Sequence, residues 1–246
     1  MLSDIYNGLK FSFSYFSILP IKFNDNINLH KKDILGSMLF FLPLVGMVLA
    51  IFSIGIFEVF SQLSYVGATI GAISYIILYG FIHSEAIIDV IDAIFAKHGG
   101  KDPYEVIKEP TVGAIGVFYG VFAILLKVVL LVYFLLNNLF FEFLAIVIIS
   151  RIALQFLVIV SKFESTFVIE LKKSFTQNYF FNSLFIFGLI GYILIGIKFF
   201  IYLIIALGIS LIISKILKRK LGFINGDVLG FTLEIVELIL LIILIT

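Results

Sequence analysis

The sequence contains no cysteine, and its acidic and basic residues nearly cancel. Without cysteine, the chain forms no disulfide and uses no thiol as a nucleophile or metal ligand. The 17 Lys and Arg against 16 Asp and Glu leave no basic excess of the kind that binds nucleic acid, so we expect no nucleic-acid partner. The N-terminal segment also lacks the ordered features of a removable signal peptide, so we expect the first span itself to direct insertion.

Apolar residues dominate the chain: 62% are hydrophobic, 29 are Phe, and the mean hydropathy is +1.20. This composition is typical of an integral membrane protein. Most of the long apolar stretches reach the length of about 20 residues that crosses a hydrocarbon core of ~30 Å. These stretches are Ile34–Phe60, Tyr65–His83, Val112–Leu136, Leu139–Val160, Phe180–Ile197, Phe199–Ile213 and Val228–Thr246. We predict an all-α, polytopic helical bundle with about seven transmembrane helices, forming a single domain over residues 1–246 without internal repeats.

An amphipathic helix is expected before the first span, over residues 2–18 and ending ahead of Pro20. Its apolar positions at helical spacing are Leu2, Ile5, Leu9, Phe13 and Phe16. Polar residues lie between them, which predicts a helix lying at the membrane interface.

The cations alternate between connections, which predicts the orientation of the chain. Fourteen of the 17 lie at the N-terminus or in every second connection: Lys10, Lys22, Lys31, Lys32, Lys97, Lys101, Lys108, Lys162, Lys172, Lys173, Lys215, Lys218, Arg219 and Lys220. The connections at 61–64 and 137–138 have none. By the positive-inside rule, the cation-rich side is cytoplasmic, with the N-terminus inside and the C-terminus outside.

Three carboxylates follow the second apolar stretch. Glu85, Asp89 and Asp92 stand at i, i+4 and i+7, so on a helix they fall within about 60° of arc on one face. The residues between them are apolar, unlike those of an ordinary solvated helix. Such a row is typical of a site for a hard divalent cation and its bound phosphate, and the alternative is a helix end emerging into water.

The loop after this row adds further polar candidates. Lys101 and Lys108 are either phosphate contacts or ordinary topology signals, and Glu109 stands at the entry to the third span. The segment Thr111–Gly116 opens a helix whose backbone N–H groups favour an anion. His83 lies about 200° around the helix from Glu85 and is either a proton acceptor or structural.

Charged residues also lie within the later spans. Arg151 is on the order of 15 Å from the cytoplasmic end of its span, and an unpaired guanidinium there is costly, so it pairs with either a carboxylate or a ligand phosphate. The last span begins at Asn225 and Asp227 and carries Glu234 one heptad later. With Glu85, Asp89, Asp92 and Glu109, Asp227 is predicted to gather at the cytoplasmic side.

The tail LKRKLGFINGDVLG, residues 217–230, followed by Glu234 and Glu237, resembles the C-terminal signature of the cobalamin synthase (adenosylcobinamide-GDP ribazoletransferase) family. Further matches in the same order are Leu19-Pro20, FLPLVG at 41–46, HSEAIIDVID at 83–92 and Ser150-Arg151. The sequence departs from the family pattern at three places: Glu85-Ala86 stands for Asp-Gly, Glu109-Pro110-Thr111 for Asp-Ser-Arg, and Ile18 for a basic residue. Both acids are retained as longer acids, whereas two cations are absent.

The resemblance implies a Mg²⁺-dependent enzyme of the cell (inner) membrane whose site faces the cytoplasm. A ribose hydroxyl of α-ribazole, or of its phosphate, attacks the cobinamide-side phosphorus of adenosylcobinamide-GDP, and GMP leaves. Such transfer requires charge neutralisation and an aligned hydroxyl. The expected metal ligands are Glu85, Asp89, Asp92 and Asp227. The expected catalytic acids are Asp89, Asp92, Glu109 and Asp227. The expected substrate contacts are His83, Lys101, Lys108, Arg151, Asn225 and Glu234.

Two other classes remain open from the residues alone. A CDP-alcohol phosphotransferase also uses clustered aspartates, but here Ala93 and Ile94 follow Asp92 where that family has Gly and further motif residues. A cation-coupled secondary transporter would carry inverted repeats and midplane acids, and we find no repeat. The partners expected are the two small-molecule substrates and membrane lipid, and a homo-oligomer is compatible with the sequence.

Overall fold

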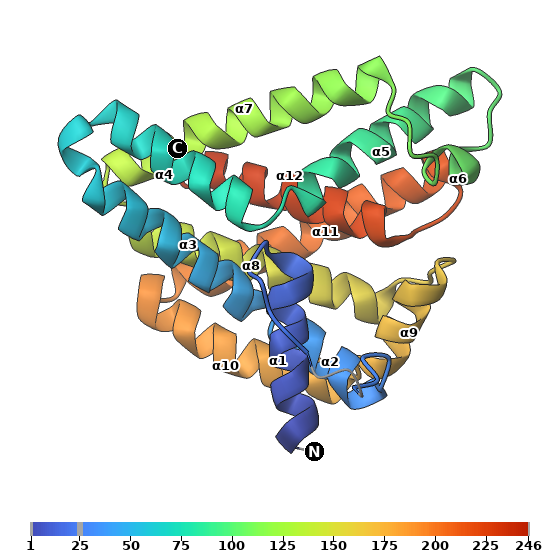
Figure 1. Cartoon of the computed structure of the whole chain (residues 1–246), viewed down its shortest axis with the longest axis horizontal. Helices are drawn as coiled ribbons and strands as arrows, with labels where there is room; N and C mark the ends of the chain where they lie inside the picture. The colour runs from blue at the N-terminus through green and yellow to red at the C-terminus, as the bar shows by residue number, and fades with distance from the viewer. Residues whose placement is uncertain (1, 24–26, 246) are drawn as a thin grey trace.

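The computed structural model describes residues 2–23 and 27–245. Within these ranges the chain is helical and has no strand (Figure 1). The helices are α1 (Leu2–Phe16), α2 (Lys32–Phe40), α3 (Leu42–Val59), η1 (Ser61–Leu63), α4 (Tyr65–Leu78), α5 (Ile82–His98), α6 (Pro103–Val106), α7 (Ala114–Leu136), α8 (Phe140–Val160), α9 (Thr166–Ser174), α10 (Gln177–Ile195), α11 (Lys198–Leu221) and α12 (Gly226–Ile243). Part of the polar segment at 22–33 and the predicted end of the last span, Thr246, lie outside the described residues.

Five helices are long and apolar enough to cross a membrane: α3, α7, α8, α10 and α11. Counting α4 and α5 together as one broken span gives six. The predicted fold class, a polytopic helical membrane protein, is confirmed. The last predicted span corresponds to α12, which has 18 residues and carries Asp227, Glu234 and Glu237.

Two predicted spans differ in extent from the helices. The first is divided at Phe41 into α2 and α3, because Pro43 lacks a backbone N–H and fits best in the first turn of a new helix. The sixth, predicted to end at Ile213, continues to Leu221 as a helix of 24 residues. Its last turns carry Lys218, Arg219 and Lys220, which end the apolar run without ending the helix and complement the negative end of the helix dipole.

The second predicted span is not one helix running into the acidic row. Gly80 and Phe81 both have positive φ, and α4 and α5 meet at 73°. The Tyr79 and Ser84 hydroxyls lie 2.9 Å apart across this break, and the backbone N–H of Ile18 donates to Leu78 O at 2.9 Å. The break directs α5 between α7 and α12, which are its main neighbours.

Helix α8 lies in the middle of the bundle, with α11 and α12 on one side and α10 on the other (Figure 1). Its side chains from Ala145 to Gln155 are all buried. This position explains why a span with no polar face still contains Arg151, since its surroundings are protein rather than lipid.

The predicted N-terminal helix is present as α1, and it runs across the other helices in Figure 1. It packs on α2 through Asp4, Gly8 and Ser12 rather than through its apolar stripe. A Cβ on Gly8 would lie 2.3 Å from Ser37 Cβ, so glycine allows the close approach. Lys31 donates to Asp4 at 2.7 Å, and this hydrogen bond lowers the pKa of the Asp4 carboxyl. The interfacial location of α1 stays a prediction.

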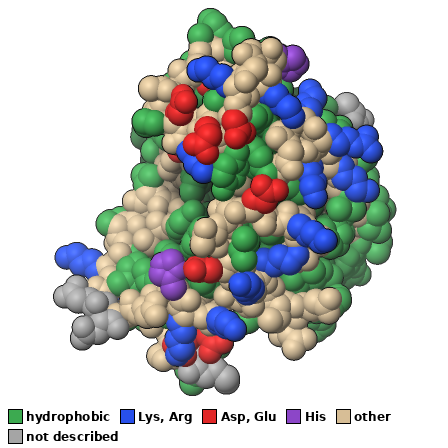
Figure 2. All heavy atoms as spheres, turned by 90° about the vertical axis from the view of Figure 1, so that its right-hand side faces the viewer, with side chains coloured by type: hydrophobic (Ala, Val, Ile, Leu, Met, Phe, Trp, Pro, Cys, Tyr) green, Lys and Arg blue, Asp and Glu red, His purple; other side chains and the backbone are tan. Residues whose placement is uncertain are grey.

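Charged side chains gather on one end of the molecule (Figure 2). This end contains the connections after α5 and α11 and the first turn of α12 (Figure 1). The predicted acidic row and most of the predicted cation-rich connections therefore share one side.

Candidate active site

The acidic row lies on α5 as predicted, with Glu85 exposed and Asp89 and Asp92 half-buried. Asp227, the second residue of α12, is also half-buried and lies close enough for its charge to act on Asp89, as do those of Glu85 and Asp92. Helices α5 and α12 approach closely at Gly230, where a Cβ would lie 2.9 Å from that of Ala86. Glycine at this position therefore allows the two acidic segments to come together.

No Lys, Arg or His among the described residues forms an ion pair with Glu85, Asp89, Asp92 or Asp227. The described part of the chain also contains no group of three His or acidic side chains close enough to hold a metal ion by themselves. The arrangement is a set of four like charges, of which Glu85 is exposed and the other three are half-buried. Such a set favours binding of a cation whose remaining coordination positions are filled by water or substrate.

Asn225 positions Asp227. Its side-chain oxygen accepts from Val228 N at 3.0 Å and caps α12, while its amide donates to Asp227 Oδ2 at 2.7 Å. Asn at this position is among the preferred N-cap residues. The predicted substrate contact Asn225 is thus a buried residue that holds the helix end and one carboxylate oxygen.

Asp92 caps the N-terminus of α7. Its carboxylate accepts from the backbone N–H of Gly113 and, at 2.8 Å, from that of Gly116. A Cβ on either glycine would lie 2.5 Å from an Asp92 atom. Two of the N–H groups expected to face a phosphate are therefore taken by this side chain, which keeps further acceptor positions on its two oxygens.

The loop between α5 and α7 forms a hollow of about 310 Å³ next to Asp92. Lys101, Glu109 and Thr111 line it. Lys108 does not, because its ammonium lies 3.7 Å from the centroid of the Tyr104 ring and 3.5 Å from Glu105. Of the two predicted lysines, only Lys101 shares a surface with predicted acids.

A buried ionic network connects α7, α8 and α12. Lys127 lies 2.7 Å from Glu234 and 2.8 Å from Glu237, and Arg151 pairs with Glu237. All four side chains are at most 3% exposed. Of the two partners expected for Arg151, the structure provides the carboxylate. Two positive and two negative charges balance, as a protein interior requires.

Tyrosine hydroxyls complete this network. Tyr79 donates to Glu234 at 2.7 Å, and Arg151 donates to the Tyr75 hydroxyl at 2.9 Å. Gly46 makes room for the guanidinium, since a Cβ there would lie 2.7 Å from Arg151 Nε. The predicted substrate contacts Arg151 and Glu234 thus pair within this network, Arg151 with Glu237 of α12 and Glu234 with Lys127 of α7, and not with the acidic row. Sequence reasoning missed Lys127, although a lysine inside a 23-residue apolar helix is itself a signal.

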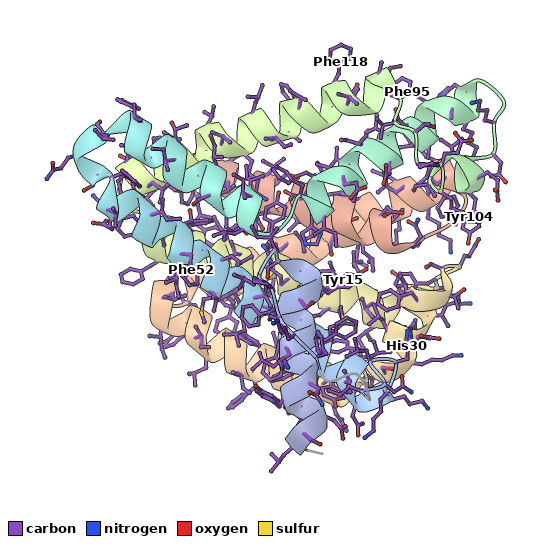
Figure 3. All side chains as sticks on the ribbon, viewed as in Figure 1. Tyr15, His30, Phe52, Phe95, Tyr104 and Phe118 are labelled. Carbon is purple, nitrogen blue, oxygen red and sulfur yellow. The ribbon has the colours of Figure 1, made fainter. Side chains whose placement is uncertain are left out.

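A separate cavity, of about 120 Å³, is lined in part by Asp227. Its walls include Tyr15, Phe16 and Phe167 from helices outside the acidic row, together with His83. Figure 3 labels Tyr15 near the end of α1. Partial burial of this ring and the nearby Asp227 carboxylate raise the pKa of the Tyr15 phenol. Tyr15 and Phe16 were not predicted as site residues, because nothing in the local pattern of α1 indicates contact with α12.

Comparison with known proteins decides the family. The family model described as cobalamin-5-phosphate synthase matches residues 8–245. The chain belongs to this family. The protein named adenosylcobinamide-GDP ribazoletransferase from Clostridium tetani is 29% identical, covering 95% of this chain and 94% of its own. The protein of the same name from Thermoplasma volcanium is 31% identical, covering 92% and 85%. No solved structure matches the chain. The resemblance carried by the sequence motifs is confirmed.

Proposed function

We propose that this chain is an adenosylcobinamide-GDP ribazoletransferase, a transferase of cobalamin synthesis. In this reaction a ribose hydroxyl of α-ribazole, or of its phosphate, forms a bond to the cobinamide-side phosphorus of adenosylcobinamide-GDP. The bond from that phosphorus to the GMP oxygen breaks, GMP leaves, and the hydroxyl proton passes to a base. The observation that carries the proposal is the set of carboxylates from α5 and α12, lacking a cationic partner among the described residues, in a chain matched by the family model over residues 8–245.

Mg²⁺ is the proposed cofactor, and the donor set fits it. Glu85, Asp89 and Asp227 offer only hard oxygen ligands, and Mg²⁺ is usually held by one or two carboxylates with water and substrate phosphates. A protein cage of three close ligands is therefore not required. When bound, the ion would neutralise the charge of the donor's pyrophosphate, including the phosphate that leaves with GMP. Asp92 contributes by holding α7 next to these ligands and retains free acceptor positions.

The remaining predicted residues divide into two roles. Glu109 and Lys101 line the hollow next to Asp92, so we assign Glu109 to accept the hydroxyl proton and Lys101 to contact a phosphate. Lys108 is an outer contact, since Tyr104 and Glu105 already hold it. We assign Arg151 and Glu234 to positioning, because their buried network fixes α12 and with it Asp227.

We further propose that the site faces the cytoplasm from the inner membrane. Supporting this orientation, charged side chains collect at the end of the molecule that holds the acidic row (Figure 2). Cytoplasmic connections carry the excess of Lys and Arg in membrane proteins. The nucleotide-linked donor would thus reach the acids without crossing the bilayer.

The proposal is tested by GMP release from detergent-purified protein given adenosylcobinamide-GDP and α-ribazole phosphate, with and without Mg²⁺. Metal-dependent GMP release coupled to a cobalamin product is expected, and Asp89→Asn should abolish it. Glu105→Gln, an exposed acid on α6, is the matched control and should retain activity. Folded wild-type protein that releases no GMP under any condition would contradict the proposal.

A further inference from the structure

The cavity beside Asp227 is small and mostly apolar. At about 120 Å³ it is well below the volume that takes a drug-sized ligand, so it accommodates a ring system and not a whole cofactor-sized substrate. Its walls come from α1, α2, α5, α8, α9 and α12. Leu154, Val158 and Val168 are among its apolar residues, and Asp227 marks the side nearest the acidic row.

His83 is the one imidazole that lines this cavity in the described part of the chain. It is 5% exposed, and no hydrogen bond to its ring is present among the described residues. Its ring centroid lies 6.2 Å from that of Phe16 and 5.8 Å from that of Tyr79, so aromatic rings hold its plane. Neither ring nitrogen is fully enclosed by protein, so a ligand in the cavity can form the hydrogen bond that the described residues do not supply.

The size and polarity of the cavity indicate which part of the proposed substrates it can bind. A corrin is far too large for this volume. Guanine presents several donors and acceptors along its edges, and burying them against leucine and valine side chains would leave them unsatisfied. The base of ribazole is a flat, fused benzimidazole ring with apolar edges and a single free ring nitrogen, which accepts one hydrogen bond. One imidazole among apolar walls matches that base.

We propose that this cavity holds the benzimidazole base of the ribazole acceptor, with a ring N–H of His83 donating to the free nitrogen of the base. This placement rests on the proposed function and deepens it. With the base between α1 and α5, the attached ribose leaves the cavity at Asp227. The reacting hydroxyl then lies at the acidic row, where the pyrophosphate of the donor is expected. Residues 15 and 16 of α1 thereby form part of the acceptor site.

The test measures binding of the nucleoside alone, without Mg²⁺ or donor, to detergent-purified protein by calorimetry. The two probes are α-ribazole and its indole analogue, in which a C–H replaces the free ring nitrogen. Wild-type protein should bind α-ribazole roughly 3- to 10-fold more tightly, the range of one neutral hydrogen bond. His83→Phe keeps a ring against Phe16 and should remove this preference while leaving indole-riboside affinity unchanged. His83→Gln restores an N–H donor and should recover part of the preference.

His98→Phe, on the same helix but at its exposed end, is the matched control and should leave both affinities unchanged. Equal affinities of wild-type protein for the two probes would overturn the proposal, and so would a preference that survives His83→Phe. The wild-type comparison needs no variant to fold. The GMP-release assay separates the two proposals. GMP release by a protein that shows no preference for α-ribazole would support the transferase and contradict the base site. A preference for α-ribazole in a protein that releases no GMP would support the base site and contradict the transferase.

Discussion

Asp92 on α5 accepts a hydrogen bond from the backbone N–H of Gly116 on α7 at 2.8 Å. The contact joins residues 24 positions apart and fixes the start of one transmembrane helix to the acidic row of another helix. It makes the glycine and the carboxylate mutually dependent, since a Cβ at position 116 would lie 2.5 Å from the carboxyl carbon of Asp92.

We therefore expect Gly116→Ala to lower GMP release with every acid still present, because the added methyl displaces the Asp92 carboxylate. Loss of the cap should also lower the unfolding free energy by about 1–2 kcal/mol. Gly208→Ala on α11 is the control, since a Cβ there meets no atom within 4 Å. Thermal unfolding and steady-state assays on both variants check this. Equal activity of the two variants would show that the position of Asp92 does not matter.

Because the carboxylates are clustered, we expect removal of one charge to abolish activity without lowering the stability of the fold. Asp89 is half-buried and close to three other acids, so Asp89→Asn relieves repulsion. In metal-free buffer we expect an unfolding free energy unchanged to within about 1 kcal/mol, or raised. Addition of Mg²⁺ should raise the melting temperature of wild-type protein by mass action, and the variant should lose most of that rise. A variant with the full rise would place the ion elsewhere.

Removing one charge from the buried network should cause a large loss of stability, and removing its partner as well should recover much of it. Lys127→Met leaves Glu234 without its cation in the interior, which costs about 3–5 kcal/mol. The double variant Lys127→Met/Glu234→Gln removes both charges and should recover much of the loss. Lys198→Met, at the exposed start of α11, should be close to neutral. Chemical denaturation in detergent of the wild type, the single variants Lys127→Met and Glu234→Gln, and the double variant measures the coupling. Simple additivity of the two single losses would contradict the pairing.

The absence of cysteine permits a direct test of orientation. Single cysteines at Glu105 and Ser61, both exposed and at opposite ends of the bundle, give unique labelling sites. If the acidic end is cytoplasmic, a membrane-impermeant maleimide should label Ser61→Cys in intact spheroplasts and Glu105→Cys only in inverted vesicles. The cysteine-free parent is the blank. The reverse pattern would invert the predicted topology.

The sequence predicts the helices well because their signal is local. Runs of apolar residues mark most of the spans, and the spacing of Glu85, Asp89 and Asp92 predicts their shared face on α5. The 73° break at Gly80 and Phe81 was missed, because Phe81 adopts positive φ only where its surroundings impose it.

The sequence did not predict which side chains pair, because the partners lie far apart along the chain. Lys127 and Glu234 are 107 residues apart, and neither shows its partner locally. The same holds for Tyr15 and Asp227, and for Asp92 and the N-terminus of α7. For Arg151, the sequence predicted that the guanidinium has a partner, because an unpaired one is costly, but it did not predict which residue or ligand the partner is.

The buried network also has a consequence for biogenesis. Membrane helices are made in order, and α12 comes last, so Lys127 and Arg151 enter the bilayer before either of their carboxylates has been synthesised. Until then, two cations in nascent helices lack counter-ions. Synthesis of α12 supplies both carboxylates, so the two cations are neutralised only once this helix has joined the bundle.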